Sequence, residues 1–573
     1  MSEEENATAP PFAQFALGKT NLVMLIKEEI RRGIMKKRFS TPVVVLLILL
    51  AVLGGMQLNT LISGDNIYEQ LAKFKDVLSL TEKFYVDDVD TQKLTESAIK
   101  GLLSDLDPHS VYIDPKQLTR VTEEFRGKFE GIGIEFAVVN DTITVVQPIG
   151  GGPSAQLGIL SNDKIVKIDG KSSIGFNNDQ VMKGLKGPKG TKVSVSIVRP
   201  GEQGVLEYEI IRDVIPFYSV DVSFMLNDEV GYINVTRFAE TTNSEMLTAL
   251  QKLKSQGMKR LVLDLRFNPG GYLDQAVKMA DLFVDGEPPT GQKKVVYTKG
   301  RRPDFNEEYY ATANSKFEKV PLIVLLSNSS ASASEIVAGA IQDWDRGLIV
   351  GETSFGKGLV QRQFELADKS AFRLTIARYY TPSGRLIQRS YASGKEKYQR
   401  EAFERDEVEG DNITHVEESD STRPVFKTAG GRKIYGGGGI TPDYIVKPGD
   451  ATQFTTVISR RNLFYEFITN YLSAHGKEIR EKYKGDFPSF NRDFEVSDAL
   501  MNEFVGYTKE KKVEYKDDQF TKDKEFIQAR LKAHIARNFW GNDGWYPVIL
   551  KADNQLKKAL SIFPEATKIA KLQ

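Results

Sequence analysis

The sequence predicts a multidomain protein with an α/β core. Between residues 215 and 390, short apolar runs such as 261–265 alternate with helix-like segments such as 244–254, which is typical of an α/β fold. Residues 128–214 show short alternating strands and glycine-rich turns, which predict an inserted domain of mixed β structure with short helices. Residues 451–573 have a helix-forming composition. A length of 573 residues agrees with several domains.

An uncharged apolar run lies near the N-terminus. Residues 39–63 contain no charged side chain, and the run is long enough to cross a hydrocarbon layer of about 30 Å. Six basic residues between positions 27 and 38 precede it, so the positive-inside bias predicts a cytoplasmic segment 1–38 and a single-pass anchor in the inner (cytoplasmic) membrane. We expect the anchor to be retained, because the preceding segment exceeds a usual signal n-region and no small-x-small site follows. The rest of the chain is then expected to face the periplasm.

The remaining boundaries follow from composition. Residues 66–127 are expected to be helical, with apolar residues from Ile67 to Leu78 at helical spacing. The core is assigned to 215–450, and within it 391–425 is rich in charge and poor in apolar residues, which predicts an exposed excursion. Two interpretations remain for the helical region 451–573: an appendage that packs on the core, or a dedicated docking surface.

Composition excludes several classes of function. The 77 basic residues balance 77 acidic ones, which argues against a nucleic-acid-binding surface. The chain has no cysteine, so it has no thiol nucleophile and no thiolate zinc site. The four histidines are scattered and show no ligand or triad grouping, so we expect no metal and no cofactor. His109, the only histidine inside a recognisable motif, is expected to be structural.

Ser332 is the candidate nucleophile. An apolar strand-like run, 321–326, precedes the segment Ser-Ala-Ser-Ala-Ser-Glu at 330–335, and helical spacing follows from Glu335 to Asp343. Ser332 therefore falls at a strand-to-helix junction, where free amides and the helix dipole favour an oxyanion. The alternative is that these serines only cap the helix.

Lys357 is the candidate base. It lies between two glycines, 25 residues after Ser332, with no acidic residue between Glu352 and Glu365 to keep it charged. A lysine base needs a pKa about 3 units below its usual value of about 10.4, which desolvation can supply. Residues 351–357 also match the start of a phosphate-binding loop, but Gly358 replaces the required Ser or Thr and a strand-like run follows. The pattern therefore favours a serine hydrolase that uses no histidine.

These residues resemble a known family. Ser332, Lys357 and Gln361, with the motif Asp-Leu-Arg-Phe-Asn-Pro-Gly-Gly at 264–271 and Tyr-Tyr-Thr-Pro-Ser-Gly at 379–384, resemble the carboxyl-terminal processing (tail-specific) proteases, serine peptidases of family S41, over about residues 70–446. The resemblance implies that Ser332 is the nucleophile, Lys357 the general base and Gln361 the residue that orients the lysine. It also implies an oxyanion hole made by the backbone amides of Ala333 and of the Gly270–Gly271 turn. Since four residues of regular strand span about 13 Å, we expect a bend near Gly358 or a lysine that reaches back.

The inserted domain resembles a PDZ domain in its order of elements. Such a domain binds an extended peptide along an edge strand, here beginning near Ile134, while the amides of Ile132, Gly133 and Ile134 face the terminal carboxylate. The pocket for the last side chain is expected to include Phe136, Val181 and Leu185.

Together these features predict a membrane-anchored serine endopeptidase that selects polypeptides by their exposed C-termini and cleaves them through an acyl-enzyme. The alternative is a non-catalytic PDZ scaffold or ligand-binding protein on the same core. Three matters stay open: delivery of targets by a lipoprotein adaptor, assembly into a homo-oligomer, and gating of the active site by the PDZ domain.

Overall fold

The computed structural model describes residues 67–286, 292–312, 316–405, 407–412 and 423–572. The expected cytoplasmic segment 1–38 and anchor 39–63 lie outside the described residues. Within the described ranges, no helix is both long enough and apolar enough to pass through a membrane. The chain divides into two compact units, Met1–Ser97 and Ala98–Gln573.

Helices dominate the part of the chain before the inserted domain, as expected for 66–127. Helix α3 (Ile67–Phe84) buries none of its residues, and α4 (Thr91–Ser104) buries Leu103. Helix α5 (Pro115–Arg126) begins at the N-cap Asp114 and ends at Gly127, which has a left-handed backbone. The sequence periodicity did not predict the short strand β1 (Val111–Ile113), which pairs with a strand of the peptidase core.

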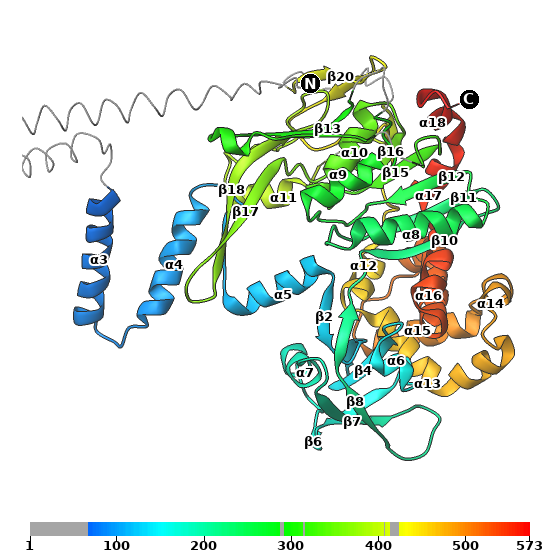
Figure 1. Ribbon diagram of the computed structural model, residues 1–573. Helices are drawn as coiled ribbons and strands as arrows, with labels where there is room; N and C mark the ends of the chain where they lie inside the picture. The colour runs from blue at the N-terminus through cyan, green and yellow to red at the C-terminus, as the bar shows by residue number, and fades with distance from the viewer. Residues whose placement is uncertain (1–66, 287–291, 313–315, 406, 413–422, 573) are drawn as a thin grey trace, which may run out of the picture. The chain divides into compact units, whose positions relative to one another are not determined.

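A seven-stranded sheet forms the centre of the α/β core, as predicted (Figure 1). Its order is β10-β11-β12-β15-β16-β22-β19, and the pairs from β11 to β22 are parallel. The strands are β10 (Val220–Met225), β11 (Val230–Val235), β12 (Arg260–Asp264), β15 (Leu322–Leu326), β16 (Leu348–Gly351), β22 (Tyr444–Ile445) and β19 (Gly410–Asp411).

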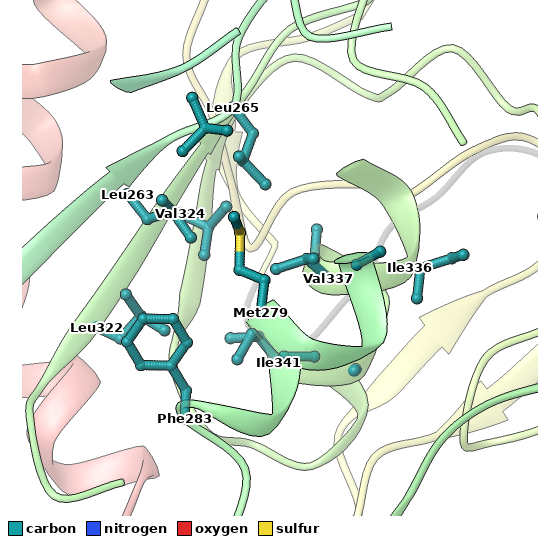
Figure 2. Close-up of a cluster of buried hydrophobic side chains, with 14 of the residues drawn as sticks. Leu263, Leu265, Met279, Phe283, Leu322, Val324, Ile336, Val337 and Ile341 are labelled. Carbon is teal, nitrogen blue, oxygen red and sulfur yellow. The ribbon is translucent and has the colours of Figure 1, made fainter. Parts of the chain in front are cut away.

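Both faces of this sheet are covered, which explains why its strands are apolar runs without alternation. On one face, α8 (Thr242–Ser255), α9 (Leu273–Asp281) and α10 (Ala333–Asp343) enclose a core in which Met279 and Val337 meet Leu263 and Val324 (Figure 2). On the other face, α17 (Asn554–Ser561) and α18 (Phe563–Ile569) pack Phe563 and their neighbours on the sheet. Since every residue of α10 is buried, the helix that follows Ser332 is held on all sides.

A second sheet flanks the first. It contains β1, β13 (Lys294–Gly300), β14 (Glu308–Tyr310), β17 (Leu359–Glu365) and β18 (Ala371–Tyr380), and a 3₁₀ turn (Pro303–Phe305) follows β13. The described residues of the region 391–425 are mostly exposed, as expected for an excursion. Its helix α11 (Lys395–Glu401) buries Tyr398, because the tyrosine ring packs on Phe355 and its hydroxyl accepts a bond from Gln388. Strands β20 (Val425–Lys427) and β21 (Lys433–Tyr435) form a small hairpin.

The inserted domain has the strand order β3-β4-β5-β7-β8, so β3 is an edge strand. Its elements are β3 (Ile134–Val139), β4 (Thr142–Pro148), α6 (Pro153–Gln156), β5 (Lys164–Ile168), β6 (Lys171–Ser172), α7 (Asn178–Leu185), β7 (Lys192–Val198) and β8 (Leu206–Ile211). The pair β2 (Lys128–Gly131) and β9 (Asp213–Pro216) lies where the chain enters and leaves the domain.

Residues 453–569, here named the C-terminal helical domain, have a hydrophobic core of their own. The core is aromatic, with Phe464 stacked on Phe504. The domain contains α12 (Gln453–Arg460), α13 (Leu463–Tyr483), α14 (Phe487–Asp493), α15 (Asp498–Glu510), α16 (Asp517–Ile549), a 3₁₀ turn (Leu550–Ala552), α17 and α18. The region is therefore a domain, and its last helices also pack on the peptidase sheet, as the first interpretation expected.

Candidate active site

The turn between β15 and α10 presents Ser332 in a strained conformation. Its backbone has φ 53° and ψ −112°, a region that costs a residue other than glycine about 1–3 kcal/mol and that is concentrated at functional sites. The neighbouring serines have structural partners: Ser330 Oγ donates to the Leu265 carbonyl and Ser334 Oγ to the Asn268 carbonyl. Of the three, Ser332 alone lines the adjacent cavity of about 1060 Å³.

Lys357 and Gln361 line the same cavity and contact each other. Lys357 Nζ donates to Gln361 Oε1 at 2.8 Å. The amide of Gln361 is held in this orientation because its Nε2 donates to the backbone carbonyl of His109. The β17–β18 pairing has a register shift between Val360 and Gln361, so the strand is irregular where Lys357 and Gln361 meet.

The surroundings of Lys357 lower the pKa of its amine. Burial, and secondarily the positive charge of Arg373, lowers the pKa of Lys357 to about 8, while Glu335 and Asp107 act in the opposite direction. Within the described residues, Nζ bonds to no carboxylate, and no hydrogen bond joins it to Ser332 Oγ. The hydroxyl of Ser332 and the largely desolvated amine of Lys357 therefore line the same cavity without a direct hydrogen bond. Such bonds are often long in enzymes that have no substrate bound.

The ring of His109 does not take part in this pair. Its Nε2 lies 2.9 Å from the hydroxyl of Tyr398, and burial with the nearby charge of Lys357 lowers its pKa to about 4. The imidazole is therefore neutral at physiological pH. His109 acts on the site through its backbone carbonyl, which agrees with the structural role predicted for it.

Glu335, for which the sequence predicted no role, connects the backbones of Ser332 and Lys357. Its buried carboxylate accepts hydrogen bonds from the amides of Ser332 (2.7 Å), Gly356 (2.7 Å) and Lys357 (2.9 Å), and from Ser354 Oγ (2.5 Å). Burial raises the pKa of Glu335, while these four donors favour its charged form. The signal available in the sequence was its position three residues after Ser332, the spacing of a capping box.

The glycine turn 270–271 lies directly against Ser332. A Cβ added at Gly270 would lie 2.7 Å from Ser332 Cβ and 2.9 Å from the amide nitrogen of Ala333, so this position excludes a side chain. The Gly270 amide already donates to Asn268 Oδ1 at 2.9 Å. In the described part of the chain, the amides of Ala333 and Gly271 have no such acceptor, so both N–H groups are free to donate.

A second cavity, of about 660 Å³, lies along the edge strand of the inserted domain. Ile132, Gly133, Ile134 and Phe136 line it from one side, and Leu185 lines it from helix α7. Val181, which was also predicted here, is fully buried in the core of the domain, and the next residue of α7, Met182, faces the cavity instead.

Family models match three parts of this architecture and the C-terminal helical domain. Peptidase family S41 matches residues 229–394, a PDZ domain matches 131–210, and the N-terminal domain of the activating protease CtpB matches 56–117. A family of unknown function matches residues 454–541.

Known proteins extend the match across most of the core. A carboxy-terminal-processing protease of Bartonella bacilliformis is 40% identical over 328 residues, which cover 56% of this chain and 74% of the relative. The carboxy-terminal processing protease CtpA of Bacillus subtilis is 36% identical over 340 residues, which cover 59% of this chain and 70% of the relative. The chain belongs to the carboxy-terminal processing proteases of peptidase family S41. This S41 peptidase is therefore an enzyme, which decides against the non-catalytic scaffold.

The S41 peptidase also aligns with solved structures. The photosystem II D1 C-terminal processing protease is 28% identical, and the alignment covers 55% of this chain and 89% of that one at a TM-score of 0.31. The family assignment rests on the sequence relatives. Because the PDZ family model matches residues 131–210, the inserted domain of this S41 peptidase is a PDZ domain.

Proposed function

We propose that this peptidase cleaves peptide bonds with a serine–lysine pair. The neutral amine of Lys357 accepts the proton of Ser332 as Oγ attacks the scissile carbonyl, and the resulting ammonium returns a proton to the leaving amine. An acyl-enzyme on Ser332 remains, and water activated by the same amine hydrolyses it. The amides of Ala333 and Gly271 bind the oxyanion in both steps.

One observation carries this mechanism: Lys357 Nζ is buried and has a pKa of about 8, and its hydrogen bond to the neutral amide of Gln361 orients it. A carboxylate in place of that amide would keep the amine protonated and unable to act as a base. Gln361 therefore gives direction to the amine without adding the negative charge that would raise its pKa.

We further propose that the PDZ domain selects substrates by their C-terminal tails. An extended tail adds to β3, its carboxylate lies at the amides of residues 132–134, and its last side chain enters the pocket formed by Phe136, Met182 and Leu185. A catalytic serine in a separate cavity means that the bond cleaved lies away from the bound terminus, so the enzyme acts as an endopeptidase.

The proposed location is the periplasmic side of the inner membrane. It rests on the uncharged run 39–63 and the basic residues that precede it. Fusions of a periplasm-active and a cytoplasm-active reporter after residue 66 test it: activity of the cytoplasmic reporter alone would contradict the orientation.

Cleavage of a model substrate tests the mechanism. The substrate carries an apolar tail with a free C-terminus, and a second version carries the same tail as an amide. We expect no turnover by Ser332→Ala or Lys357→Ala, and wild-type turnover by Lys433→Ala, which changes an exposed lysine of the same core. Turnover by Ser332→Ala refutes the nucleophile, and equal cleavage of the two substrates by the wild type refutes selection by the tail.

A further inference from the structure

The C-terminal helical domain reaches the peptide-binding edge of the PDZ domain. Arg537 on α16 donates from Nη2 to both carboxylate oxygens of Glu135, at 2.9 Å and 3.1 Å. Glu135 is the second residue of β3, the strand that a bound tail would extend. Gln147, opposite Glu135 on β4, donates to the same carboxylate at 2.9 Å. The guanidinium therefore lies at the strand that binds substrate.

A kink in α16 makes this approach possible. Gly541 has φ 58° and ψ −144°, and a Cβ at this position would lie 2.8 Å from Gln147 Oε1. The positive φ favours glycine at this position, and an added side chain would have to displace the end of the Gln147 side chain. After the kink the helix contacts the peptidase core, where Asn542 Nδ2 and the hydroxyl of Tyr546 each lie 2.7 Å from the carboxylate of Asp221 on β10. One short stretch of α16, residues 537–546, thus carries hydrogen bonds both to the PDZ domain and to strand β10 of the core.

The cavity along β3 is shared by three domains. Besides the PDZ residues, Arg537 and Asn542 of the C-terminal helical domain line it, as do Thr236 and Arg237 of the peptidase core. Thr236 and Arg237 also line the catalytic cavity that contains Ser332. Helix α16 therefore lines part of the cavity along β3. The same cavity adjoins the catalytic cavity at Thr236 and Arg237.

We propose that the C-terminal helical domain is part of the tail-binding site, and that Arg537 positions β3 through Glu135 to receive a polypeptide C-terminus. This inference rests on the proposed selection of substrates by their tails and assigns a role to a region that matches a family of unknown function. Arg537 is a positioning residue: it binds the carboxylate of Glu135 at the cavity along β3, and Asp221 binds the other end of the same helical segment to the core.

A charge exchange tests the proposal in the full-length protein. The probe is a fluorescein-labelled peptide with a free apolar C-terminus, measured by anisotropy against Ser332→Ala protein so that it is not cleaved. In that background, Arg537→Glu places two carboxylates together and raises the Kd roughly tenfold, while the exchange Glu135→Arg with Arg537→Glu restores it to within about threefold. Lys524→Glu breaks an exposed ion pair with Asp498 in the same domain and is the matched control, with an unchanged Kd.

The outcomes separate this inference from the function on which it rests. An unchanged Kd in folded Arg537→Glu, or a failure of the exchange to restore binding, overturns the role of Arg537. Equal binding of the free and amidated peptides by the Ser332→Ala protein overturns tail recognition itself. If Arg537→Glu does not fold, Arg537→Gln replaces it, with an expected rise of about threefold in Kd and the same refuting result.

Discussion

Replacing Lys357 by methionine is expected to stabilise the folded protein while removing its activity. Methionine fills a similar volume but carries no charge into the buried site. Burial lowers the pKa of Lys357 from its ordinary 10.5 to about 8. At about 1.36 kcal/mol per pH unit, this lowering of about 2.5 units corresponds to a cost of about 3.4 kcal/mol for holding the charged amine in the folded state. Loss of the hydrogen bond to Gln361 offsets about 1 kcal/mol.

The free energy of unfolding of the wild type should depend on pH because of this lowered pKa. Between about pH 8 and pH 10.5 the unfolded chain binds the proton that folded Lys357 has lost, so the wild type gains stability as the pH rises through this window. The cost is fully present below about pH 8 and vanishes above about 10.5. The methionine variant has no such contribution, so we expect it to be more stable than the wild type by about 2 kcal/mol near pH 7.

Urea unfolding of both proteins at several pH values measures the difference. The advantage of the variant should shrink by about 2 kcal/mol between about pH 6.5 and about pH 9.5. Lys433→Met, which changes an exposed lysine of the core, controls for added hydrophobicity and should show no such trend. A Lys357→Met protein that is less stable than the wild type at neutral pH, or an advantage independent of pH, would refute the reasoning that the amine is held in a desolvated site.

Three substitutions around the site have distinct expected effects on catalysis. Gln361→Glu places a carboxylate where an amide oxygen now lies 2.8 Å from Lys357 Nζ. The negative charge should raise the pKa of the lysine by about 1–3 units and shift the pH–rate profile to higher pH. An unshifted profile contradicts the role of the amide. Gly271→Ala puts a Cβ 2.1 Å from the Phe238 carbonyl oxygen and displaces the amide proposed to bind the oxyanion. The value of kcat should therefore fall about 10²- to 10³-fold. A near wild-type kcat argues against this donor. Glu335→Gln turns a side-chain NH₂ toward backbone amides that also donate. It should lower the stability of the fold by about 1–3 kcal/mol, and it should also lower kcat. An unchanged melting temperature contradicts the connecting role of Glu335.

Local patterns predicted the reactive part of the fold well. The apolar run before Ser332 and the helical spacing after it became β15 and α10, because burial on both faces dictates the composition of a central strand and its neighbouring helix. Strand geometry alone also indicated that a regular strand could not bring Lys357 to Gln361 without a bend near Gly358 or a lysine that reaches back. These features depend on residues that are close in sequence.

Contacts between distant segments could not be predicted in the same way. Glu335 acquires its role from amides about 20 residues further on, and Tyr398 is buried by a ring of Phe355 that composition does not indicate. The bond between Arg537 and Glu135 joins residues 402 positions apart. Val181 was placed in the pocket instead of Met182 because an error of one residue in helical phase turns a side chain by about 100°.

The pH dependence of kcat/KM for a tailed substrate tests the central claim most directly. A lysine base with a pKa of about 8 predicts that kcat/KM increases about tenfold per pH unit below that pH and levels off above it, and that Lys357→Ala abolishes the activity. A profile that is flat from about pH 6 to about pH 9, or one that follows a group titrating near the ordinary pKa of lysine, would contradict the account.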